Sequence, residues 1–261
     1  MVGLPRRIAH TDEVALVDHL DELRNRLFVA LAALGVSFGV TFWRHQDILD
    51  LLNRQLPDEV GKPVTLSPAE PFTTAIMVSL YASFIIALPI IFYQVYAFVI
   101  PAFSDITARR VWPLLLLVPA LFVGGAAFGY VVLLPAAADF LLNFDSENYQ
   151  TEVRAREWYG FAATTLTAMG LMFEMPAAAA LFARIGLLRS SWMRKNRRIA
   201  IVLLAVMAAL LPTVDPVSLI LEMIPLLILY EASIWVAKLV EPDHVEMDEE
   251  FEDDEVAGVP A

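Results

Sequence analysis

The stretch Val17–Leu27, VDHLDELRNRL, concentrates charge immediately before a nearly uncharged run, FVALAALGVSFGVTFW. Its leucines recur at helical spacing, which predicts one apolar stripe, with Asp18, Glu22 and Arg26 on the opposite side. A carboxylate presented there matches the geometry of an arginine guanidinium, so the segment is a candidate site for a cationic ligand. The alternative is an interfacial helix whose Glu22–Arg26 pair is an ordinary ion pair, worth roughly 0.2–0.5 kcal/mol.

Three further acidic residues lie inside apolar segments. A charge at the membrane centre costs on the order of 2.5–3.5 kcal/mol on insertion scales, so Glu174 should face protein or water. It is either functional or a neutral, hydrogen-bonded acid that stabilises helix packing. Glu222 and Glu231 lie nine residues apart, about two and a half turns, and therefore face opposite sides of one helix. We expect Glu231 to reach water or to pair with Lys238.

The chain lacks the sequence signatures of catalysis. It has no cysteine, which excludes disulfides and thiolate metal sites. No GxSxG, HExxH or GxxxxGK[ST] motif occurs, and the four histidines, at positions 10, 19, 45 and 244, lie outside the apolar segments. We therefore predict no enzymatic site, no metal and no cofactor.

The composition indicates an integral membrane protein. Of the 261 residues, 58% are hydrophobic, whereas soluble domains are about 45–50% apolar. A helix needs about 20 apolar residues to cross a hydrocarbon core of roughly 30 Å. We therefore expect an all-α membrane domain over residues 1–240, with six transmembrane helices near residues 27–43, 72–100, 111–134, 159–182, 199–211 and 217–237.

Positively charged residues predict the orientation of these spans, because Lys and Arg are enriched in cytoplasmic segments. Summed over alternate connections, they number thirteen on one side and five on the other. Both termini are therefore expected to be cytoplasmic. Glu241–Glu255 hold ten acids and no Lys or Arg. We expect residues 241–261 to be a disordered acidic tail, because such a block repels itself and cannot bury a core.

The fifth and sixth predicted spans are short. Residues 199–211 make a helix of about 20 Å, less than the thickness of the hydrocarbon core, and PTVDP allows only a tight reversal after it. Such a hairpin must thin the membrane or rest against partner helices. Prolines in or beside the spans predict bent or interrupted helices, at positions 89, 101, 113, 119, 135, 176, 212, 216 and 225.

Four motifs in order, HLDELRNRL, FYQVYAFVIPAF, GLMFEMP and LLPTVDPVS, resemble the TatC family, the polytopic subunit of the twin-arginine protein translocase. The resemblance runs from His19 to Lys238. It implies a glove-shaped six-helix bundle in a prokaryotic cell membrane. It also implies a receptor for Arg-Arg signal peptides that exports folded proteins with the proton-motive force. Implied partners are TatA-like and TatB-like single-span subunits, other TatC copies and the lipid bilayer, with no nucleic acid.

The resemblance also assigns residues. It implies that Glu22 helps to bind the paired arginines of the signal peptide, with Arg24 in the same motif. It adds Gln94 and Phe98 to the signal-peptide site. Further matches are Glu174 as the intramembrane glutamate, Asp215 as the acidic residue of the turn between the short helices, and the fifth span as the docking surface for single-span partners.

One loop departs from the family pattern. The family usually places a glutamate directly before two arginines, as the second ligand for the signal arginines. Here the loop reads PAFSDITARR, with Thr107 at that position and Asp105 as its one carboxylate. Asp105 would take the role if the loop shifts.

Two other classes of function compete with this interpretation. A proton- or ion-coupled secondary transporter would use Glu174 and Glu222, and would predict discontinuous helices in two related halves. No internal repeat is detectable in the sequence. A structural scaffold would leave Glu22 and Glu174 replaceable.

Overall fold

The computed structural model describes residues 10–57, 60–103, 112–148, 151–184, 186–211 and 215–241. Every regular element in these ranges is a helix, and the one β contact among them is an isolated parallel bridge between Val64 and Arg154. The all-α prediction is therefore confirmed. The elements are α1 (His10–Trp43), α2 (His45–Asn53), α3 (Glu70–Phe103), α4 (Trp112–Phe128), the π-helical turn η3 (Gly129–Leu133), α5 (Leu134–Asn143), α6 (Ala155–Phe173), α7 (Met175–Arg184), α8 (Ser190–Lys195), α9 (Arg197–Ala209) and α10 (Pro216–Val240).

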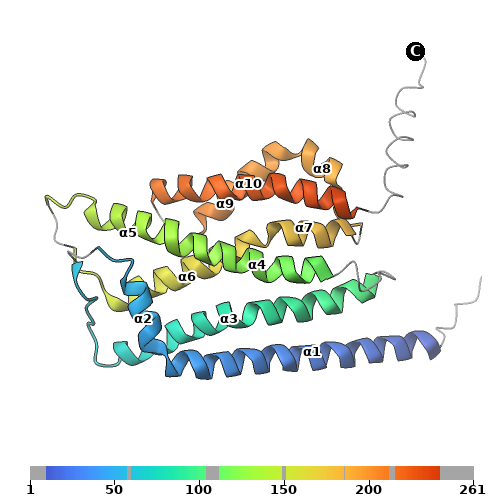
Figure 1. The fold of residues 1–261 in the computed structure, drawn as a ribbon, viewed down its shortest axis with the longest axis horizontal. Coiled ribbons are helices and arrows are strands. Elements are labelled where there is room, and N and C mark those ends of the chain that lie inside the picture. Colours follow the sequence, from blue (N-terminus) through green and yellow to red (C-terminus); the bar gives the residue numbers. More distant parts are fainter. Residues whose placement is uncertain are drawn as a thin grey trace, which may run out of the picture.

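The long helices run side by side, and the chain passes back and forth between two ends of the molecule (Figure 1). α1 packs along α3, α3 contacts α4 and α6, and α7 packs on α10, which also contacts α9. The starts of α1 and α8 and the ends of α3 and α10 lie at one end, here termed the N-terminal end. The opposite end, termed the cap end, holds α2, the end of α5 and the start of α6.

Five helical segments are long and apolar enough to cross a membrane. α9, the predicted fifth span, has 13 residues and is therefore about 20 Å long, against a hydrocarbon core of roughly 30 Å. In Figure 1, α9 and the start of α10 stop short of the cap end, which α5 reaches. The five segments cover residues 21–43, 70–95, 117–143, 155–184 and 216–240.

The predicted interruptions occur at some of the prolines and not at others. α3, α4 and α10 stay helical through Pro89, Pro119 and Pro225, respectively. The segment that begins with α4 changes to the π-helical turn η3 directly before α5, and the first turn of α5 contains Pro135. The other interruption separates α6 from α7 two residues before Pro176. Pro176 has no N–H and its ring clashes with the preceding turn, which accounts for this break.

Side-chain hydrogen bonds join the segments of the cap end. Tyr159 Oη donates to Asn53 Oδ1 over 2.8 Å, and Tyr130 Oη donates to the carbonyl of Leu51 over 3.0 Å. The amide of Val64 donates to the carbonyl of Val153 over 2.8 Å. These bonds connect α2 and the α2–α3 connection to η3 and to the start of α6, so the cap end is held by contacts between segments far apart in the chain.

α4 and α6 approach closely at glycines. A Cβ atom on Gly125 of α4 would lie 2.5 Å from the carbonyl oxygen of Met169. A Cβ atom on Gly170 of α6 would lie 2.4 Å from the ring of Phe122, which is fully buried. Only glycine allows this approach, and it fixes the position of the C-terminal end of α6, where Glu174 lies.

Candidate functional site

The charged segment at the start of α1 contacts α3 through Arg26. The Nε atom of Arg26 donates to Glu22 Oε1 over 3.0 Å, and its Nη2 atom donates to the same oxygen over 2.5 Å. Its Nη1 atom donates to Gln94 Oε1 over 3.3 Å. One guanidinium therefore joins a carboxylate of α1 to an amide of α3, 68 residues further along the chain.

This arrangement contains the Glu22–Arg26 ion pair that the sequence analysis gave as an alternative. The Glu22 side chain is 42% exposed and that of Arg26 is 24% exposed. Ion pairs at this level of exposure stabilise a protein by at most about 1 kcal/mol. The contact with Gln94 adds a tertiary link that an isolated interfacial helix would not have.

The other predicted residues of the signal-peptide site differ in their surroundings. Arg24 Nη2 lies 3.3 Å from Asp21 Oδ1, and both side chains are largely exposed. Phe98 is half-buried and follows Gln94 by four residues on α3, so the two share a helix face. Asp105 lies outside the described residues.

Glu174 lies at the junction of α6 and α7 and is 7% exposed. Within the described part of the chain, neither of its carboxyl oxygens has a hydrogen-bond partner. No described residue therefore supplies the hydrogen bond that the helix-packing interpretation requires. The residue lines a groove of about 330 Å³ between α6, α7, α9 and α10; the other lining residues are Leu171, Met172, Met175, Ala178, Ala200, Leu203, Leu204, Met207 and Tyr230.

Asp215 is buried at 3% exposure and forms the N-cap of α10. Its Oδ1 atom accepts a hydrogen bond of 2.7 Å from the backbone amide of Ser218. Pro216 follows at the first helical position, where its fixed φ suits a helix start. The carboxylate therefore has a structural role at the start of this helix, whatever further role it takes.

The two remaining acidic residues of α10 lie in different environments. Glu222 is fully buried. Glu231 Oε2 accepts a hydrogen bond of 2.8 Å from Arg197 Nη2 of α9. The Glu231 side chain is 47% exposed, so it reaches water as expected, and the cation paired with it is Arg197 rather than Lys238. The Glu231–Arg197 pair joins the start of α9 to the second half of α10.

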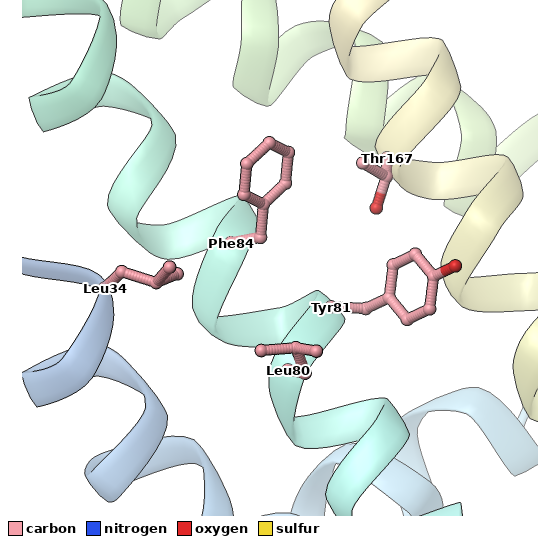
Figure 2. A pocket seen from close by; sticks show the side chains of 5 residues that line it. All are labelled: Leu34, Leu80, Tyr81, Phe84 and Thr167. Carbon is pink, nitrogen blue, oxygen red and sulfur yellow. The ribbon is translucent and has the colours of Figure 1, made fainter. Parts of the chain in front are cut away.

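A second pocket, of about 310 Å³, opens between α1, α3 and α6. Figure 2 shows that Tyr81 and Phe84 point from α3 toward α6, where the hydroxyl of Thr167 lies near them, and that Leu34 points from α1 toward α3. The remaining lining residue is Leu80, so the wall is almost entirely apolar.

The sequence did not predict two contacts between distant segments. It paired Arg26 with Glu22 but gave no signal for the contact with Gln94. It also missed Glu70 and Arg154, whose hydrogen bond at the cap end raises the pKa of Arg154 above its usual value. In the described ranges, no group of three or more His, Asp or Glu side chains is placed to hold a metal ion.

Comparison with known proteins identifies the family. Residues 18–225 match the family model described as Sec-independent protein translocase protein (TatC). The chain belongs to the TatC family. It is 31% identical over 236 residues to the TatC protein of Koribacter versatilis, a match covering 88% of this chain and 87% of the relative. It is 38% identical over 229 residues to TatC of Campylobacter jejuni, covering 86% of this chain and 94% of the relative.

The fold also matches solved structures of TatC. A crystal structure of the twin-arginine translocase receptor TatC superimposes with a TM-score of 0.73 at 33% identity, covering 85% of this chain and 99% of the other. A second crystal structure, of TatC in DDM, gives a TM-score of 0.75. A chloroplastic TatC of Pisum sativum is 31% identical over 228 residues, covering 87% of this chain and 65% of the relative.

TatC membership gives the class of function. The chain is a multi-pass membrane protein of a protein translocase family, and this family consists of transport receptors rather than enzymes. The sequence-based recognition of the family is confirmed, and the secondary transporter is not favoured.

Proposed function

We propose that this TatC-family chain is the receptor subunit that binds the paired arginines of a signal peptide during export of folded proteins with the proton-motive force. The observation that carries the proposal is the Glu22 carboxylate. It already holds one guanidinium, that of Arg26, and 42% of its side chain remains exposed. A surface that binds an arginine of its own offers the chemistry needed for an arginine of a ligand.

The binding step is an exchange of guanidinium groups. An incoming signal arginine takes the place of Arg26 on Glu22, while Arg26 keeps its hydrogen bond to Gln94. The carboxylate is never left without a cation, which avoids the cost of an unpaired charge at the membrane surface. Phe98, on the same face of α3 as Gln94, would contact the apolar residues that follow the arginines. Asp105 would hold the second arginine, and Arg24 would complete the site.

The exchange needs the N-terminal end to face the cytoplasm, where signal peptides arrive. The thirteen Lys and Arg residues of the connections and termini assigned to that side, against five on the other, support this orientation. Glu22 lies in the first half of α1, and this helix starts at the N-terminal end (Figure 1).

The apolar core of the signal peptide would then move toward Glu174. The pocket between α1, α3 and α6 is apolar, and the groove at Glu174 is lined mainly by apolar side chains. Both suit a chain of aliphatic side chains better than a polar ligand. The two oxygens of Glu174, which no described residue hydrogen-bonds, would gain a polar partner from whatever segment enters the groove.

α9 is the surface on which TatA-like and TatB-like single-span subunits would dock. It lines the Glu174 groove and presents exposed apolar side chains along its length, among them Val202, Leu203 and Val206. A helix of 13 residues does not reach across a bilayer of ordinary thickness, so the membrane beside it would thin. Partner subunits gathered there, together with other TatC copies, would form the passage.

A pair of substitutions tests the receptor role. Glu22→Ala should abolish export of a folded reporter that carries an Arg-Arg signal, and should abolish site-specific crosslinking of that signal to α1. The matched control is Asp21→Ala, which removes the neighbouring exposed carboxylate that pairs with Arg24. Unchanged export and crosslinks in Glu22→Ala would overturn the proposal.

A further inference from the structure

α8 is held against α10 by polar contacts on one side. Tyr230 Oη of α10 donates to the carbonyl of Met193 over 2.8 Å. Ser190 Oγ donates to Glu241 Oε2 over 2.7 Å, and the Ser190 amide donates to the same oxygen over 3.4 Å. Ser190 and Met193 are buried. The orientation of this short helix is therefore set by α10, although α8 has only six residues.

The outer side of the same segment forms a pocket of about 270 Å³. It is lined by Gly186, Leu187, Leu188, Arg189 and Trp192. Leu187 is 70% exposed and Trp192 is 58% exposed, so both apolar side chains lie at the surface. The volume is slightly below that of pockets for drug-sized ligands, about 300–1,000 Å³, so the pocket suits a small chemical group. One cation and several apolar side chains line it, which favours a group with a polar part and an apolar part.

The segment around this pocket carries a high positive charge. Six Lys and Arg residues lie between Arg184 and Arg198. Of these six cations, only Arg197 forms an ion pair with a residue that the structure describes, Glu231. The Glu241 carboxylate faces Ser190 rather than a cation. The cations without an ion pair to a described residue are Arg184, Arg189, Arg194, Lys195 and Arg198.

The pocket lies where two candidate membrane-spanning segments end, at Arg184 and Val240, which is where a layer of lipid headgroups is expected. α7 ends at Arg184, at the end of the bundle where α10 also ends (Figure 1), and the Ser190–Glu241 hydrogen bond places the start of α8 beside the end of α10. Tryptophan prefers this interfacial layer, and basic pockets beside membrane helices attract anionic headgroups. The positive-inside rule accounts for the number of cations, but it does not account for a pocket that combines one of them with exposed Trp and Leu side chains.

We propose that this pocket binds the phosphodiester headgroup of an anionic phospholipid. Arg189, whose backbone precedes the fixed Ser190, holds the phosphate, while Trp192 and Leu187 contact the glycerol and the first methylene groups of the acyl chains. The surrounding cations raise the local concentration of anionic lipid. The site ties the α7–α9 connection to the membrane surface, and it is separate from Glu22 on α1.

The experiment measures lipid retained by the purified full-length chain in native mass spectrometry. The probe is dioleoyl phosphatidylglycerol, and dioleoyl phosphatidylcholine has the same acyl chains without the net charge. We expect Arg189→Gln to lower retention of the anionic lipid at least tenfold. Arg198→Gln makes the same charge change outside the pocket and should lower it by roughly fivefold or less, the loss of one cation near an anionic surface.

Trp192→Ala separates a site from diffuse attraction, because it changes no charge. Since Trp192 is largely exposed, its loss leaves no internal cavity. The proposal requires this variant to lose anionic lipid as well. It is overturned if Arg189→Gln and Arg198→Gln lose lipid equally, if Trp192→Ala retains it fully, or if millimolar inorganic phosphate displaces the lipid, which would make the pocket a site for free phosphate. Retention of phosphatidylcholine equal to that of phosphatidylglycerol would also overturn it.

Discussion

Glu70 and Arg154 lie 84 residues apart in the chain, and Arg154 Nε donates to Glu70 Oε1 over 2.9 Å. The Glu70 side chain is only 3% exposed, and its Oε2 atom also accepts the backbone amide of Leu66 over 3.0 Å. One carboxylate therefore joins the α2–α3 connection to the residue just before α6. The parallel bridge between Val64 and Arg154 lies beside it.

We expect Arg154→Gln to lower the thermal midpoint of the purified protein by several degrees, because it leaves the Glu70 carboxylate buried without its cation. Replacing both residues, Glu70→Gln with Arg154→Gln, should cost less than the sum of the single changes. Thermal unfolding in detergent measures both. Arg156→Gln, an exposed neighbour, is the control. Additive losses would mean that the two side chains do not interact.

The close contact of α4 with α6 predicts opposite effects at adjacent glycines. Gly125→Ala should destabilise the fold by about 1–3 kcal/mol, because its Cβ would overlap the backbone oxygen of Met169. Gly124→Ala meets no atom within 4 Å and should be neutral or stabilise the helix by up to about 1 kcal/mol. Thermal midpoints compare the two variants. Equal effects would show that the helices do not approach as described.

The bridge from Arg26 to Gln94 predicts that Gln94 tunes binding of the signal peptide. Gln94→Ala removes an acceptor worth about 0.5–1.5 kcal/mol, so the affinity for an Arg-Arg signal peptide should fall roughly two- to tenfold. Gln46→Ala on α2 is the control at the cap end. In an Arg26→Ala background, the Gln94 change should have no further effect. A full additional loss there would mean that Gln94 acts without Arg26.

No described residue hydrogen-bonds the carboxyl oxygens of Glu174, which predicts that stability and export place opposite demands on this position. Glu174→Leu should raise the thermal midpoint, because it removes a buried polar group that has no hydrogen bond to the described part of the chain. The same variant should lower export of the reporter. Met172→Leu, in the same groove, should leave export unchanged. A lowered midpoint in Glu174→Leu would show that the carboxyl has a stabilising partner.

The N-cap at Asp215 predicts which substitutions are tolerated. Asn also caps helices well, so Asp215→Asn should retain stability and export, whereas Asp215→Ala should lose about 1 kcal/mol of stability. Thermal unfolding and the export assay are read together. If Asp215→Asn folds normally but fails in export, the charge itself has a function.

The long helices and their order follow from local properties of the sequence. Runs such as residues 72–100 are apolar enough to be helices in lipid whatever their neighbours, because a backbone in hydrocarbon must satisfy its own hydrogen bonds. The length of α9 also follows from the local sequence, because the charged residues before it and the prolines after it leave room for only about thirteen apolar residues. The Glu22–Arg26 pair came from the spacing of four residues along one helix.

Tertiary packing decided the rest. No pattern within α1 indicates that Arg26 meets Gln94, and nothing near Glu70 indicates Arg154, because contacts between distant segments depend on how the helices approach one another. Pro89 and Pro119 do not interrupt their helices, because a helix packed among others can satisfy the backbone groups that a proline frees. The glycine contact between α4 and α6 sets the approach that positions Glu174. Local sequence determines which segments are helical, whereas the side chains that meet depend on interhelical geometry, to which residues far apart in the chain contribute together.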